Sequence, residues 1–379
     1  MKQVKARVSW IDNAKFFAIA CVVLGHSFSL IKGNFNGYDE INLFIVAFNM
    51  PLFALLSGVT SFQALSKISS FSDLLIYFNK ITWHIGVPTI VYTLIAMAIG
   101  YGMQMRWDRC TISAILLIIV CASVYLIRFS KYSSKLKKIV HYFPYCLLPV
   151  CLLNQSVWYF VYVILSFFAA AISAFISNKS EKYKRFIYCI LFAIISLLIA
   201  PISPFFSTVE LYFPFVIGYL FASYKGLSEV SNKTGMQLTI AVILLVIGVF
   251  TFIKYYSISN QFYLLNLNRA FMNGQMDIFA LRQISAISLS VMFVIIIQFL
   301  SKSYNLISTV GAMTFGIYPI HSELIVIAKR GRGLLIGYNV VWLKLIIVIF
   351  IALLLLSVSV IFVTVIRKTD FTKLLFLGE

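Results

Sequence analysis

An aspartate, a lysine and a histidine lie within one apolar segment near the start of the chain, where they could support acid–base chemistry. Lys15 and His26 are eleven residues apart, close to three helical turns, so both project from one face. Asp12 precedes Lys15 by three residues and can pair with it. His26 then lies roughly 16 Å further along that face. A neutral imidazole can be buried at tolerable cost and still act as a base.

Ionisable groups inside an apolar span indicate function, since each costs roughly 2.5 kcal/mol or more near the bilayer centre. For His26 the alternative is a packing role, with the ring bonded to a backbone carbonyl. The chain has only four histidines, and this one falls inside a span. We therefore favour a functional role for His26.

The composition indicates that membrane helices position these residues. The 379 residues are 61% hydrophobic and 11% charged, whereas soluble domains carry about 25% charged residues. A net charge of +19 would suggest nucleic acid in a soluble protein. Here the basic residues lie mostly in short loops, as the positive-inside rule predicts, so we expect a lipid bilayer and no nucleic acid. The six cysteines form no Cys-x-x-Cys pair, which indicates neither a metal site nor a disulfide framework.

We predict an all-α bundle of about ten to twelve transmembrane helices, forming a single membrane-embedded domain over residues 1–379. The apolar runs cover residues 10–31, 42–62, 82–103, 111–129, 139–153, 157–177, 186–201, 209–223, 236–253, 284–300, 304–326 and 340–366. The first run lacks a small-residue cleavage site and is interpreted as a retained span. Lysine-rich loops alternate so that both termini are expected in the cytosol.

Two loops expected on the outer side differ from that pattern. Residues 329–332 are basic, which indicates either an error in the span count or a basic patch for an anionic substrate. Residues 254–283 form the longest predicted loop and include the polar residues Asp277 and Arg282. This loop is either a lid over an outward-facing site or a solvated connector.

Further candidates lie at the ends and breaks of the predicted spans. Asn49 precedes Pro51, and small Ser57 and Gly58 follow, a pattern typical of a kinked helix in close contact with another. Lys80 and His84 are four residues apart at the cytosolic mouth of a span. There they could receive phosphates or act as interfacial anchors.

Four more candidates come from later spans. Trp158 begins a span on the outer side, as residues of an aromatic belt do, and Glu210 opens another span on that side. His321 and Glu323 lie in an apolar segment after Pro319. Functional and structural roles remain equally open for this last pair.

These blocks, taken in order, resemble the acyltransferase-3 family of membrane acyltransferases, and within it the fucose 4-O-acetylase-like and exopolysaccharide O-acyltransferase branch. The blocks are Ile11-Asp12-Asn13-Ala14-Lys15 with Val22-Val23-Leu24-Gly25-His26, Asn49-Met50-Pro51-Leu52-Phe53 with Ser57-Gly58, Lys80 with Pro88, Trp158-Tyr159-Phe160, Tyr212-Phe213-Pro214-Phe215 with Gly218, and Gly311 with Ile317-Tyr318 and His321. The family's arginine-x10-histidine pattern falls on Lys15 and His26. A lysine keeps the charge but lacks the bidentate fork of arginine. Asn49 stands where this branch commonly has a histidine.

The resemblance implies transfer of an acetyl or similar short acyl group from acyl-CoA to a hydroxyl of a cell-surface or exported polysaccharide. It implies catalytic roles for His26, Asp12 and Lys15, acetyl-CoA as co-substrate, and no bound cofactor or metal. Taking the residues and the resemblance together, we predict that the substrate-binding residues are Lys80, His84, Asn49, Ser57, Trp158, Glu210, His321 and Glu323. A bacterial plasma membrane and polysaccharide synthesis or export machinery are the expected location and partner.

Two mechanisms fit His26: a base that activates the sugar hydroxyl, or a nucleophile that forms a transient acyl-histidine. The alternative function is a transporter or flippase for a glycan or its lipid-linked precursor, in which the buried charges would gate or relay protons. No internal repeat of the transporter kind is found. A purely structural subunit would leave the buried charges unexplained.

Overall fold

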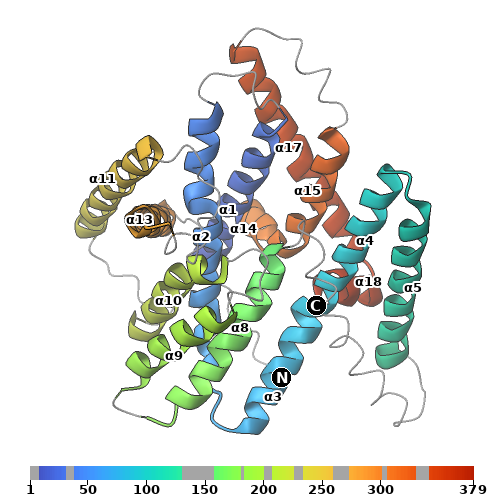
Figure 1. Ribbon diagram of the computed structural model, residues 1–379, viewed down its shortest axis with the longest axis horizontal. Coiled ribbons are helices and arrows are strands. Elements are labelled where there is room, and N and C mark those ends of the chain that lie inside the picture. The colour runs from blue at the N-terminus through green and yellow to red at the C-terminus, as the bar shows by residue number, and fades with distance from the viewer. Residues whose placement is uncertain are drawn as a thin grey trace. The chain divides into compact units, whose positions relative to one another are not determined.

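The computed structural model describes residues 8–30, 38–129, 158–180, 183–199, 207–225, 234–258, 273–300, 305–329 and 341–379, and the regular structure within these ranges is helical throughout (Figure 1). The helices are α1 (Ser9–Phe28), α2 (Tyr38–Leu65), α3 (Phe71–Ile81), η1 (Thr82–Gly86), α4 (Val87–Met103), α5 (Trp107–Phe129), α8 (Trp158–Ser177), α9 (Lys184–Ile199), α10 (Ser207–Lys225), α11 (Thr234–Ile258), α13 (Met276–Leu300), α14 (Asn305–Gly311), α15 (Thr314–Ala328), α17 (Val341–Ile366) and α18 (Asp370–Leu377).

The prediction of an all-α multi-pass membrane bundle is confirmed. Among the described residues, eight helices are long and apolar enough to cross a bilayer, and two shorter apolar helices lie in α10 and α15. The predicted apolar runs fall on helices where the structure describes them, while the run 139–153 lies outside the described ranges. The run 304–326, predicted as one span, is instead divided by a turn at 312–313 into α14 and α15. The total of ten to twelve spans and the cytosolic termini stay predictions.

The predicted loop 254–283 is wrong at both ends. α11 continues to Ile258 and α13 already begins at Met276, so Asp277 and Arg282 belong to a helix. The polar residues of this stretch lower its hydropathy without ending the helix. Residues 259–272 lie outside the described ranges. Neither the lid nor the connector can therefore include Arg282, which is buried within α13.

The chain divides into two compact units, residues 1–66 with 206–360 and residues 67–205 with 361–379. The first unit holds α1, α2, α10, α11, α13, α14, α15 and most of α17. The second holds α3, η1, α4, α5, α8, α9 and α18. The prediction of a single domain over 1–379 stays a prediction.

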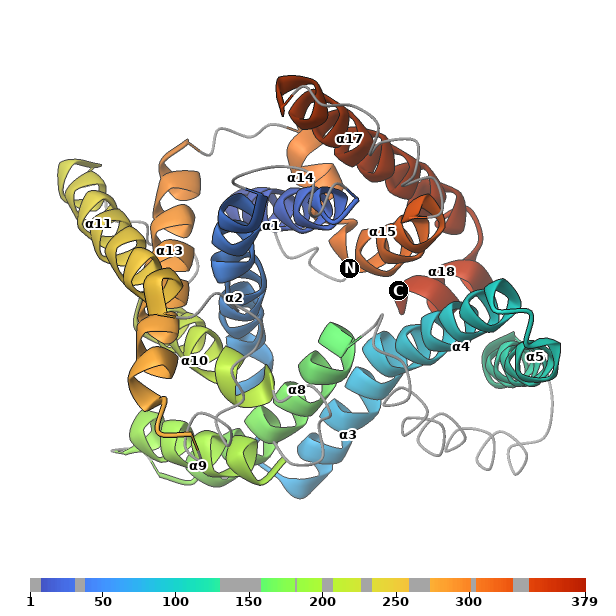
Figure 2. The same ribbon diagram turned by 45° about the horizontal axis from the view of Figure 1, so that its top comes forward.

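In the first unit α1 packs beside α2, and α14 and α15 follow one another along a different side of α1 (Figure 2). α2 also contacts α10 and α13, and α13 packs along α11. The core between α1 and α2 includes Ala14, Ala18, Leu52 and Leu56, each almost fully buried. Small residues on α1 face larger ones on α2, which brings the two helices close together.

Two glycines allow α2 and α10 to cross at close range. A Cβ on Gly58 would lie 2.0 Å from the carbonyl oxygen of Phe215, and a Cβ on Gly218 would lie 2.0 Å from that of Leu55. Each glycine therefore faces the backbone of the other helix, a contact favoured between membrane helices because it brings the two backbones into van der Waals contact. The close contact predicted from Ser57 and Gly58 is confirmed.

In the second unit, an amphipathic helix leads into the membrane span. Ser70 caps α3 reciprocally with Asp73, so the helix begins sharply at Phe71. Its end passes into the π-helical turn η1 and then, with Pro88 in the first turn, into α4. α4 packs against α5, and α8 packs against α9 and α3. The C-terminal helix α18 packs on α4 and is capped by Gly378, which adopts φ +66°.

Candidate active site

Helix α1 carries Asp12, Lys15 and His26 on one continuous helix, as the spacing predicts. The Lys15 ammonium lies 3.8 Å from Oδ1 of Asp12, so the predicted ion pair is confirmed. Asp12 is buried, whereas the Lys15 side chain is 30% exposed. A pair with one partly exposed partner contributes at most about 1 kcal/mol to stability. The pair therefore places the Lys15 ammonium at this end of α1.

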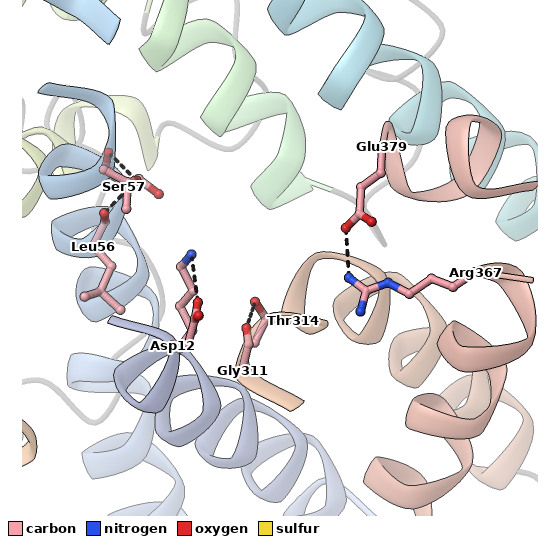
Figure 3. A network of polar contacts seen from close by, with 9 residues as sticks. Asp12, Leu56, Ser57, Gly311, Thr314, Arg367 and Glu379 are labelled. Atoms are coloured by element: carbon pink, nitrogen blue, oxygen red, sulfur yellow. Dashed lines mark hydrogen bonds and ion pairs between the residues drawn. The ribbon is translucent and has the colours of Figure 1, made fainter. Parts of the chain in front are cut away.

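The backbone of α1 meets α14 at the same end. A Cβ on Gly311 would lie 1.8 Å from the carbonyl oxygen of Asp12, so only glycine allows this approach. Thr314 then begins α15, with its hydroxyl donating to the Gly311 carbonyl at 3.0 Å (Figure 3). The approach of Gly311 to Asp12 fixes where α15 starts beside α1. It therefore also fixes which residues of α15 lie beside the His26 end of α1.

At the other end of α1, two histidines meet. The ring centroids of His26 and His321 are 5.3 Å apart, with an angle of 54° between the ring planes. His26 is exposed, whereas His321 is completely buried. The structure thus brings together two residues that were predicted separately. They come from α1 and α15, which are distant in the sequence.

The orientation of the His321 ring is fixed by its own helix. Its Nδ1 lies 3.0 Å from the carbonyl oxygen of Ile317, which can only accept a hydrogen bond, so Nδ1 carries the proton. Nε2 is then the nitrogen with a lone pair, and among the described residues this buried atom has no hydrogen-bond partner. The ring of Tyr318 packs edge-on against His321 at 5.6 Å.

Two further residues lie near His26, and neither was assigned to its surroundings from the sequence. The amide oxygen of buried Asn42 would lie 3.4 Å from a Cβ on Gly25, so α2 packs closely beside the His26 turn. Exposed Lys329, just beyond α15, acts electrostatically on His26. Lys329 belongs to the basic segment predicted as an outer patch, of which residues 330–332 lie outside the described ranges.

Asn49 and Ser57 lie on α2 and make local contacts. Oδ1 of buried Asn49 accepts a hydrogen bond from the backbone N–H of Met50 at 2.6 Å, just before Pro51. Ser57 is half-buried beside the α2–α10 crossing, and its carbonyl accepts from the Thr60 hydroxyl at 3.2 Å. Their substrate-binding roles stay predictions.

Lys80 and His84 lie in the second unit, where Lys80 is exposed in the last turn of α3. His84 falls in η1, and its Nδ1 is hydrogen-bonded to the carbonyl oxygen of Gly378. Glu379, next in the chain, accepts from Arg367 at 2.8 Å (Figure 3) and lies 3.7 Å from Lys373. The Gly378 carbonyl thus occupies one ring nitrogen of His84, and the phosphate-binding role of Lys80 and His84 stays a prediction.

The remaining candidates are less defined. Trp158 begins α8 and Glu210 lies in α10, but their side chains are outside those described. Glu323 is half-buried two residues after His321, and residues two apart on a helix face different sides. The structure therefore does not bring Glu323 to the face that His321 presents.

Arg282 and Gln283 fall at the end of the predicted loop 254–283, yet both are buried in α13 with 6% exposure. Neither polar atom of the Gln283 side chain has a hydrogen-bond partner among the described residues. A polar cluster directly before an apolar run was the only available signal, and it was interpreted as a loop.

Comparison with known families identifies the class of protein that this fold and site form. A family model described as an acyltransferase domain matches residues 8–365, nearly the whole chain and both units. The chain therefore belongs to the acyltransferase-3 family and is a multi-pass membrane acyltransferase. No curated protein and no solved structure matches it.

Proposed function

We propose that this protein transfers an acetyl or similar short acyl group from acyl-CoA to a hydroxyl of a cell-surface or exported polysaccharide. It would do so in a bacterial plasma membrane, beside the machinery that makes or exports that polysaccharide. The observation that carries the proposal is the exposed imidazole of His26 on α1, within a chain of the acyltransferase-3 family. The order of its motifs is similar to the fucose 4-O-acetylase-like and exopolysaccharide branch.

In the proposed reaction His26 is the general base. It removes the proton from a sugar hydroxyl while the hydroxyl oxygen attacks the thioester carbonyl. The carbon–sulfur bond then breaks, and the imidazolium returns its proton to the departing thiolate. The products are an O-acyl sugar and the free CoA thiol, and His26 is regenerated. A positioned base of this kind contributes about 10²- to 10⁴-fold to the rate.

The charges at the other end of α1 suit the donor. The Lys15 ammonium is partly exposed, and Asp12 holds it in place. Phosphate groups bind lysine as a point charge. We assign Lys15 to the phosphates of CoA, which separates donor binding from proton transfer. Lys80 and His84 lie in the second unit, and their phosphate-binding role is a separate proposal.

The experiment is transfer of labelled acetyl from acetyl-CoA by the purified protein to polysaccharide extracted from cells that lack it. The expected result is ester-linked label in the polysaccharide, with one thiol released for each acetyl transferred. A transporter or flippase needs no acyl donor, so unchanged acetyl-CoA together with glycan translocation in vesicles would contradict the proposal.

A further inference from the structure

The buried nitrogen of His321 is the most unusual polar atom near the candidate site. Polar atoms buried in a bilayer-spanning protein normally have partners, because a buried donor or acceptor without a hydrogen bond has lost its hydration without compensation. His321 is completely buried, yet among the described residues Nε2 accepts from nothing. Nδ1 is already engaged by the Ile317 carbonyl. Nε2 is thus a fixed acceptor without a donor.

The side chain beside it can supply that donor. The ring centroids of His26 and His321 are 5.3 Å apart, a separation that allows a ring N–H of His26 to reach hydrogen-bond distance of Nε2 when the two nitrogens face each other. Tyr318 packs on the edge of the His321 ring and limits its movement. The acceptor is therefore rigid, and the donor is the side chain that can turn.

We infer that His321 is a positioning residue for His26, accepting a hydrogen bond from one ring nitrogen so that the other nitrogen faces the acyl acceptor. This inference rests on the proposed function, since it assigns the second residue of the same proton transfer. His26 in this tautomer has one N–H directed to His321 and one lone pair directed to the sugar hydroxyl. When His26 takes the proton, the existing N–H becomes a charge-assisted donor to Nε2.

A neutral acceptor suits this position better than a carboxylate. A buried carboxylate would be costly in an apolar span while the site is empty. The neutral imidazole of His321 has no such cost, and its hydrogen bond strengthens only when His26 becomes positive. The stabilisation is therefore larger in the transition state than in the resting protein, which is the condition for catalysis.

Two substitutions at His321 distinguish the loss of the hydrogen-bond acceptor from the loss of side-chain volume. The side-chain oxygen in His321→Gln can occupy the place of Nε2, whereas that in His321→Asn reaches only the place of Nδ1. Ser322→Ala is the matched control, because this next hydroxyl donates only to the Pro319 carbonyl of its own helix. His321→Leu removes the acceptor altogether.

The test measures kcat and KM of acetyl transfer for purified wild type and these variants. We expect kcat to fall roughly 10- to 100-fold in His321→Leu and His321→Asn, as part of what a positioned base contributes. His321→Gln should keep most of the activity, Ser322→Ala should match wild type, and KM for acetyl-CoA should be unchanged throughout. If His321→Leu does not accumulate in cells, comparing the activities of His321→Gln and His321→Asn tests the role of the acceptor.

Equal activity of the glutamine and asparagine variants, or wild-type activity of His321→Leu, would overturn the role of His321. An effect confined to KM would do so too. Failure of the wild type itself to transfer acetyl would instead overturn the proposed function, so the two failures are distinguishable.

Discussion

The two ends of α1 differ in how their polar groups are used. At one end Asp12 pairs with Lys15 at 3.8 Å, and the backbone meets Gly311 with no room for a side chain. At the other end His26 is exposed beside His321, whose Nε2 has no partner among the described residues. The Asp12 end of α1 is fixed by packing and ionic contacts, whereas the His26 end presents an imidazole that can take part in proton transfer.

This difference teaches that the cost of burying a polar residue does not by itself locate a reaction. Asp12 is buried at 6% exposure and has a partner, so its burial serves to hold a charge and a helix contact. Completely buried His321 has an acceptor, Nε2, with no hydrogen-bond partner among the residues that the structure describes. Unused hydrogen-bonding capacity next to an exposed imidazole is the better indicator of chemistry.

The largest expected effect comes from the reactive end. His26→Ala removes the base and should lower acetyl transfer by about 10²- to 10⁴-fold. The measurement is proton NMR of ester-linked acetyl in surface polysaccharide from cells producing each variant at equal protein level. Ser27→Ala is the control, because this neighbouring hydroxyl donates to the Val23 carbonyl of its own helix. Normal acetyl content in the His26→Ala cells would contradict the assignment of the catalytic base to the His26 end of α1.

Substitution at the Asp12 end of α1 should change the stability of the protein to unfolding. Gly311→Ala forces a Cβ against the Asp12 carbonyl and should destabilise the protein by about 1–3 kcal/mol or more. Gly100→Ala, where a Cβ meets nothing within 4 Å, should leave stability unchanged or slightly raised. Thermal unfolding in detergent, followed by tryptophan fluorescence, compares the two. Equal unfolding temperatures would show that α14 does not depend on this approach.

Substitution of Lys15 should weaken binding of the acyl-CoA donor. Lys15→Met removes the charge and should raise KM for acetyl-CoA roughly tenfold, the value of one hydrogen bond to a charged group. Lys15→Arg should restore most of the affinity, since it keeps the charge. Acetylpantetheine, which lacks the nucleotide phosphates, is the control substrate and should show no difference between variants. An equal rise in KM for both substrates would contradict phosphate binding by Lys15.

The smallest effect is expected at the C-terminal segment of the second unit. His84→Ala removes the hydrogen bond to the Gly378 carbonyl, worth about 1 kcal/mol. Amide hydrogen exchange in α18 should therefore accelerate severalfold, while exchange in α5 stays the same. Unchanged exchange in α18 would mean that packing on α4 alone holds the helix.

The sequence predicted local features of the fold well. Apolar runs located the described spans, and the three-residue spacing predicted the ion pair between Asp12 and Lys15. Gly58 indicated the close helix contact, although its partner Gly218 could not be paired with it from the sequence. These features depend on neighbours in the sequence or on one residue type.

The features that could not be predicted depend on tertiary structure. The approach of His321 to His26 depends on where Gly311 lets α14 meet α1. Buried Arg282 was assigned to a loop because hydropathy does not distinguish a polar helical turn from a connector. α18 is short and amphipathic, and so fell below the length expected of a span.

The most direct test of the difference between the two ends is release of the CoA thiol by purified wild type, His26→Ala and Lys15→Met at saturating acetyl-CoA and polysaccharide. We expect Lys15→Met to approach the wild-type kcat, because saturation overcomes weaker donor binding, while His26→Ala stays at least about 10²-fold slower. A wild-type kcat in His26→Ala would contradict the assignment of proton transfer to this histidine.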